Sequence, residues 1–225
     1  ASFDGTTEPA GAAGFRAPKA DGLTYAEARL NRGVQLSAGA GPLVYAGGQL
    51  DLSKPGGLYF WFGSLDVRGD DQRVLPLVSV RDGQRSIRVF LGGDRYLYVV
   101  HVGPRAAFRY RYPIYDLLPE YPGFGRRGPA ADVRHFIAYQ WGPDGAGLYV
   151  NALPARVVPL KLAQEMTPPP PALPDAGDAV AIGAAKAGMV FDEVLLTDTR
   201  KTPDELRDLY VSFLTGTYQL PIPEI

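Results

Sequence analysis

The chain has 225 residues, of which 46% are hydrophobic, and this apolar content can fill the core of one large all-β domain. It has no cysteine, which excludes disulfides, thiolate catalysis and cysteine-ligated zinc. The formal net charge of −1 gives no general attraction to nucleic acid or anionic lipid, and no apolar run reaches the roughly 20 residues that span a bilayer. We therefore expect neither nucleic acid binding nor membrane insertion.

The N-terminal region predicts an extended arm followed by a short helix. Residues 1–21 are rich in glycine, alanine and proline and have no periodic apolar face. Thr24 to Glu27 matches a capping box, and Gly33 is suited to end a helix. We expect the arm, including this helix, to occupy residues 1–32.

A period of two begins at Val34 and predicts a series of short strands. The strongest of them is apolar on both faces around Trp61, so it is expected to be central and buried. The spacing of about ten residues is typical of a sandwich or barrel. The predicted strands in this half of the chain cover residues 34–36, 43–45, 49–52, 58–67, 74–80, 87–91 and 96–102.

The second half of the chain predicts a hairpin, a strand pair and one helix. Residues 134–141 and 147–151 flank a turn at 142–145, and strands at 181–183 and 191–196 follow a proline-rich external connection. The helix starts at Thr202, because threonine can cap, proline fits the first helical position, and Glu205 completes the capping box. The tail at residues 217–225 has spaced prolines and is expected to be extended.

Three of these patterns, in this order, resemble the concanavalin A-like lectin/glucanase superfamily, and in particular its laminin-G-like domains. The first is Leu50 to Ser53 followed by Leu58 to Trp61, and the second is the hairpin from His135 to Asn151. The third runs from Ile182 through Asp192-Glu193 to the Thr-Pro-x-Glu helix start. Two positions depart from the family pattern: Arg134 replaces an aromatic residue and Ala152 replaces a glycine.

The resemblance implies an all-β fold, a jelly-roll sandwich of two antiparallel sheets with a short C-terminal helix. We expect this domain to occupy residues 33–216. It also implies a secreted or cell-surface binding module rather than an enzyme. Hydrolases of the superfamily carry Glu-x-Asp-x-x-Glu on one strand, and this pattern does not occur in the chain.

The aromatic segment at residues 104–129 is the main candidate for a contact site. Residues 108–112 alternate aromatic and arginine side chains, so a strand would place the two kinds on opposite faces. Tyrosine suits sugar stacking or a protein interface, arginine adds planar donors, and the same rings could instead complete the core. The candidate contact residues are Arg109, Tyr110, Arg111, Tyr112, Tyr115 and Tyr121.

Catalytic and metal sites are weaker alternatives. Asp192 and Glu193 are adjacent, so on a strand they point to opposite faces and do not form a hydrolytic pair. His135 is expected to be a strand histidine satisfied by a neighbour. No cofactor is predicted; calcium at the acidic loop 66–71, with Asp144 and Asn151 as further oxygen donors, is less favoured than a solvated turn.

The leading prediction is a non-catalytic extracellular interaction module for adhesion or for assembly of a surface structure. Its partners would be another protein or neighbouring copies of this chain, which the terminal arms could contact. A carbohydrate-binding module is the first alternative, and a glycan-cleaving enzyme with an unrecognised carboxylate pair is the second.

Overall fold

The structure is a computed structural model of the 225-residue chain. It describes residues 23–27, 32–36, 41–46, 48–64, 74–92, 96–104, 107–113, 134–155, 158–159, 173, 179–183 and 189–215. Within these ranges no helix is long and apolar enough to cross a membrane.

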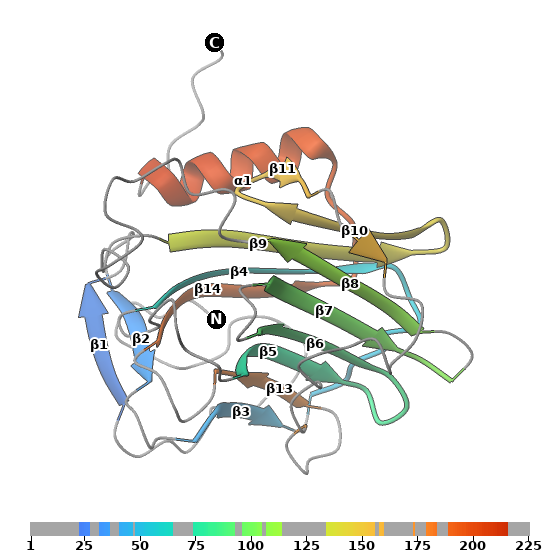
Figure 1. The fold of residues 1–225 in the computed structure, drawn as a ribbon, viewed down its shortest axis with the longest axis horizontal. Helices are drawn as coiled ribbons and strands as arrows, with labels where there is room; N and C mark the ends of the chain where they lie inside the picture. Colours follow the sequence, from blue (N-terminus) through green and yellow to red (C-terminus); the bar gives the residue numbers. More distant parts are fainter. Residues whose placement is uncertain are drawn as a thin grey trace.

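The described strands form two antiparallel sheets (Figure 1). One, here called the helix-side sheet, has the order β1 (Leu23–Glu27), β2 (Arg32–Leu36), β14 (Met189–Thr197), β4 (Gly56–Ser64), β9 (Arg134–Gly142), β10 (Gly145–Val150) and β11 (Leu153–Pro154). The opposite sheet has the order β12 (Val158–Pro159), β8 (Ala107–Pro113), β7 (Tyr96–Val102), β6 (Ser86–Leu91), β5 (Leu75–Arg81), β13 (Ala179–Ile182) and β3 (Leu43–Ala46). The predicted all-β sandwich of two antiparallel sheets with one helix is confirmed, and its sheets fit a jelly roll.

The main core lies between the two sheets. β4 contributes Leu58, Phe60 and Phe62 from one face, and β9 contributes Ile137 and Tyr139 beside them. Alternate residues of β5, β6 and β7 meet them from the opposite sheet. The strand around Trp61 is therefore central and buried on both faces, as its apolar sequence predicts.

Helix α1 (Pro203–Thr215) covers the outer face of the helix-side sheet (Figure 1). Leu206 is fully buried, and the Tyr210 ring stacks on Trp61 of β4 with centroids 5.5 Å apart. The predicted capping box is present: the Glu205 amide donates to the Thr202 hydroxyl at 3.2 Å, and the Thr202 amide donates to the Glu205 carboxylate at 2.7 Å. These two bonds satisfy helix-end amides that have no partner within the helix.

Two local predictions are wrong. The predicted helix after Thr24 is instead strand β1, whose residues pair with β2 from Leu23 opposite Leu36 to Glu27 opposite Arg32. The sheet therefore begins before residue 33. A cap pattern contributes only about 1 kcal/mol, so pairing with a neighbouring strand overrides it.

The predicted strand at residues 49–52 is a turn. Asp51 accepts hydrogen bonds from the amide and hydroxyl of Ser53, and its carbonyl accepts from the Lys54 amide at 3.2 Å. Aspartate favours such local bonds over strand pairing. The predicted arm at residues 1–21, the tail at 217–225 and the four prolines at 168–171 lie outside the described residues.

Candidate functional site

The predicted contact residues of β8 divide between the two faces of the strand. Tyr112 is only 8% exposed and packs in the main core, and Tyr110 is partly buried against that core. Arg109 and Arg111 lie on the other face, where the Arg111 guanidinium stands 4.9 Å from the Tyr96 ring centroid. Tyr115 and Tyr121 lie outside the described residues. The strand thus has the alternation that the sequence predicts, with its tyrosines turned inward.

A pocket opens at one end of the sandwich, where turns of both sheets meet. It encloses about 700 Å³ and is here called the end pocket. This volume lies within the range of small-molecule sites, about 300 to 1,000 Å³. The described lining residues come from the loop before β4, the β5–β6 turn, the ends of β7, β8 and β9, and the connections that follow β7 and β9: Leu52, Ser53, Pro55, Gln84, Arg85, His101, Gly103, Pro104, Phe108, Trp141, Gly142 and Pro143.

Three of the described lining residues carry aromatic rings. His101 and Phe108 face each other across β7 and β8 with centroids 6.0 Å apart, and His101 meets Trp141 of β9 edge-on at 5.8 Å. His101 and Trp141 are almost fully buried, whereas Phe108 is 39% exposed. Of the three, Phe108 is therefore the ring most accessible to a ligand.

Gly56 makes room for the Trp141 indole. A Cβ atom at position 56 would lie 2.6 Å from Cζ2 of Trp141 and 2.7 Å from the backbone oxygen of Thr197. Neither atom belongs to a flexible chain end. A glycine at the start of β4 is therefore needed for the ring to reach the end pocket.

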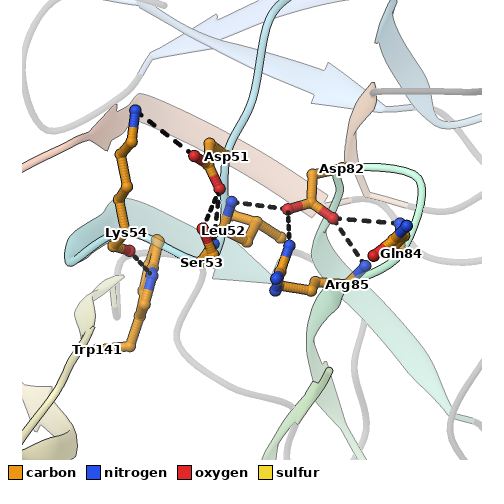
Figure 2. Close-up of polar contacts among 8 residues, drawn as sticks. All are labelled: Asp51, Leu52, Ser53, Lys54, Asp82, Gln84, Arg85 and Trp141. Carbon is orange, nitrogen blue, oxygen red and sulfur yellow. Dashed lines mark hydrogen bonds and ion pairs between the residues drawn. The ribbon is translucent and has the colours of Figure 1, made fainter. Parts of the chain in front are cut away.

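Asp82 holds together two turns that line the pocket, as Figure 2 shows. Its carboxylate accepts the Leu52 amide at 2.7 Å, the Arg85 amide at 2.7 Å and the Gln84 amide at 3.2 Å. The Arg85 guanidinium adds an ion pair at 3.3 Å, and the Asp82 side chain is only 2% exposed. A buried carboxylate with this many donors is a fixed structural element, not a free acid or base.

The loop before β4 is held on its other side by Asp51 and Trp141 (Figure 2). Lys54 pairs with the exposed Asp51 at 3.5 Å, and its carbonyl accepts the Trp141 indole N–H at 2.8 Å. Hydrogen bonds from Ser53 are the main cause of the lowered pKa of the Asp51 carboxyl. The indole therefore has a satisfied donor, and its remaining surface is apolar.

His101 is neutral at physiological pH. Burial lowers its pKa to about 4. Its Nδ1 atom lies 3.1 Å from the Tyr139 hydroxyl, and burial raises the pKa of that hydroxyl. Because Nδ1 has this partner, Nε2 is the nitrogen that His101 can offer to the pocket.

The other chemical candidates are structural. Asp192 and Glu193 are buried at a bulge of β14, where Glu193 has a φ of 48°. The Asn151 side-chain oxygen accepts the Phe136 amide at 3.0 Å, so it is already engaged. In the described part of the chain, no group of three or more acidic or histidine side chains could hold a metal ion. The acidic loop 66–71 lies outside that part.

His135 differs from the prediction that a neighbour satisfies it. Its ring lies 5.6 Å from that of Phe62, and its buried Nδ1 has no hydrogen-bond partner among the residues that the structure describes. Burial lowers its pKa to about 4.

Sequence reasoning missed the end pocket because its lining residues are scattered through the chain. Phe108 belongs to the aromatic segment but was not among the predicted contact residues. Trp141 is part of the hairpin motif and indicates only the fold. What the three rings share is their position: Trp141, His101 and Phe108 each lie near a strand end, on the face that points between the sheets. This position indicates a common site only when the strand order is known.

Comparison with known proteins shows a likeness of fold. No protein-family model and no curated protein matches the chain. Among solved structures, the receptor-binding domain of botulinum neurotoxin D matches with a TM-score of 0.62 at 10% identity, over 88% of this chain and 47% of that chain. The binding domain of botulinum neurotoxin DC in complex with SialylT matches with a TM-score of 0.60 at 9% identity, over 88% and 46%.

A third similar structure is the receptor-binding domain of the C/D mosaic serotype, with a TM-score of 0.60, 10% identity and coverage of 88% and 46%. This chain thus spans about half the length of the chains that it matches. At such low identity the likeness supports the two-sheet sandwich and no residue role. The concanavalin A-like and laminin-G-like assignment stays a prediction.

Proposed function

We propose that this chain is a non-catalytic binding module that holds a saccharide in the end pocket. The observation that carries the proposal is the exposed Phe108 ring beside a pocket whose rim has polar side chains. A sugar ring has an apolar face that stacks on an aromatic ring and hydroxyl groups that need hydrogen-bond partners. Arg85, Gln84 and His101 supply such partners at the pocket.

The lining residues favour binding over hydrolysis. Glycoside hydrolysis needs two carboxyl groups facing the scissile bond, about 5 to 10 Å apart. None of the described lining residues is an aspartate or glutamate. Asp82 lies next to the pocket, but its oxygens accept three backbone amides and pair with Arg85.

The neighbouring folds give a weaker, independent support. One of the similar structures is a complex of the botulinum neurotoxin DC binding domain with SialylT. Another belongs to botulinum neurotoxin type C, whose cell entry depends on interaction with two ganglioside molecules. These statements concern the toxin domains. They make a glycan a reasonable first class of ligand to test on a sandwich of this shape.

A protein partner is the second candidate, through the face of β8 that carries Arg109 and Arg111. Both side chains are half-buried on the side away from the core tyrosines. Arginine is enriched at protein interfaces. Adhesion or surface assembly of a secreted or cell-surface protein would use this arginine face, because Tyr110 and Tyr112 point toward the core. Contacts through Tyr115, Tyr121 and self-association through the terminal arms remain proposals, since these residues lie outside the described part of the chain.

A glycan array tests the proposal on three proteins: the wild type, Phe108→Ala and Leu153→Ala. Leu153 is the matched control, because it is a large apolar residue, 65% exposed, on strand β11 and not in the pocket lining. We expect the wild type and Leu153→Ala to bind the same glycans. Phe108→Ala should lose about tenfold in affinity, which corresponds to about 1.4 kcal/mol.

Two results would overturn the saccharide proposal. One is a wild-type protein that binds no glycan on the array. The other is glycan binding that survives Phe108→Ala but is lost in an Arg109→Ala, Arg111→Ala double variant, which would place the contact on the outer face of β8.

A further inference from the structure

We infer that the end pocket selects an uncharged sugar, a neutral hexopyranose, over an acidic one. This inference rests on the proposed function and adds the charge class of the ligand. It follows from the charged side chains at the pocket, from the ion pair that they already form, and from the aromatic ring on which the sugar would stack.

The charge of the pocket is already balanced. Arg85 is the only formally charged side chain among the described lining residues, and its guanidinium pairs with the carboxylate of Asp82 at 3.3 Å. Asp82 is nearly inaccessible to solvent, so water cannot replace Arg85 as the partner of this charge. A ligand carboxylate would compete for Arg85 and would bring a second negative charge close to Asp82.

The remaining polar groups suit hydroxyls. The Arg85 guanidinium has N–H groups beyond the one that faces Asp82, and hydroxyl oxygens can accept from them without separating the ion pair. His101 offers one nitrogen, since the other is paired with Tyr139. Burial keeps His101 uncharged at neutral pH, so it supplies no cation for an acidic ligand.

The aromatic surface also favours an uncharged ring. Phe108 presents a hydrocarbon face with no hydroxyl, and the Trp141 indole has its N–H bound to the Lys54 carbonyl. A carboxylate placed against these rings would lose water and gain no hydrogen-bond donor from the rings, which is costly. The C–H face of a neutral hexose makes the same contact without that cost.

The test is calorimetric titration of the intact protein with two sets of probes. The first set is the methyl glycosides of glucose, galactose and mannose; the second is methyl glucuronide and the methyl glycoside of N-acetylneuraminic acid. We expect at least one neutral glycoside to bind about tenfold more tightly than either acid. Its Kd should change less than about twofold between 0.05 and 0.5 M salt, because no net charge is exchanged.

The Phe108→Ala variant locates the binding. Phe108 is partly exposed, so its removal should leave the thermal midpoint close to that of the wild type, and the affinity for the neutral glycoside should fall about tenfold. Leu153→Ala serves again as the control.

The outcomes separate this inference from the proposed function. An acidic glycoside that binds more tightly, weakens with salt and is lost in Phe108→Ala would overturn the neutral preference and leave the saccharide site standing. If neither set binds at concentrations up to about 10 mM, where even weak sites are occupied, the neutral-sugar inference fails, and the saccharide proposal fails with it if the wild type also binds no glycan on the array.

Discussion

The Asp82 carboxylate accepts a hydrogen bond from the Leu52 amide, 30 residues earlier in the chain, at 2.7 Å. This bond joins the β5–β6 turn to the loop before β4 (Figure 2), and both line the end pocket. Neither segment forms strand pairs at this point. On this side, the shape of the pocket rim therefore depends on one buried side chain.

We expect Asp82→Ala to destabilise the fold by about 3 kcal/mol, because it leaves two partly buried amides without an acceptor and Arg85 without its partner. Asp82→Asn keeps one acceptor oxygen and should lose about half as much. Urea unfolding measures both values.

Asp51→Ala is the matched control, since Asp51 holds the same loop but is exposed and, among the described residues, bonds to Ser53 and Lys54 alone. Its loss should be clearly smaller than that of Asp82→Ala. Equal losses for the two variants would contradict the role assigned to Asp82.

Both histidines should make the fold less stable in mild acid. Burial lowers the pKa of His101 and of His135 to about 4, whereas an unfolded histidine titrates near about 6.5. As the pH falls from 6.5 toward 4, the unfolded chain takes up protons that the folded chain does not. Stability is therefore complete above pH 6.5 and is lost toward pH 4, by up to about 3 kcal/mol per histidine.

Urea unfolding between pH 5 and 7 measures this effect in a range where most carboxylates stay ionised. The His101→Gln, His135→Gln double variant is the comparison, and its stability should change much less with pH over this interval. Parallel curves for the two proteins would show that the histidines are not the cause.

Ala152 sits in a backbone conformation that suits glycine. Its φ is 62°, in the left-handed region, and it follows Asn151, whose φ is 51°. The left-handed conformation costs a residue with a side chain about 1 to 2 kcal/mol, and glycine avoids this cost. Glycine also has more conformational freedom in the unfolded chain, which cancels part of the gain in stability. We expect Ala152→Gly to stabilise the protein by about 0.5 to 1 kcal/mol, measured by thermal or urea unfolding.

The reverse substitution at Gly183 should have the opposite sign. Gly183 has a φ of 73°, and a Cβ atom there would lie 2.0 Å from Cδ1 of the fully buried Leu36. Gly183→Ala should therefore destabilise by at least about 2 kcal/mol. A neutral Gly183→Ala, or a destabilising Ala152→Gly, would contradict the backbone geometry on which both predictions depend.

The sequence was sufficient wherever the deciding interactions are local. The α1 start was predicted because Thr202 and Glu205 are three residues apart and bond to each other's amides. The central position of β4 was predicted because its residues are apolar on both faces. The helix predicted after Thr24 is wrong, because this segment pairs with β2 as a strand. The sequence of one segment does not indicate which other segment will lie beside it.

By itself, then, the sequence determined the sandwich, because strand periodicity, turn residues and the helix cap act over a few residues. Only the tertiary structure decided which side chains form a site. Tyr110 and Tyr112 looked like contact residues, but the sheet turns them toward the core. Phe108, His101 and Trp141 meet because three strands end at the same mouth of the sandwich, and strand order is set by long-range pairing that no local pattern encodes.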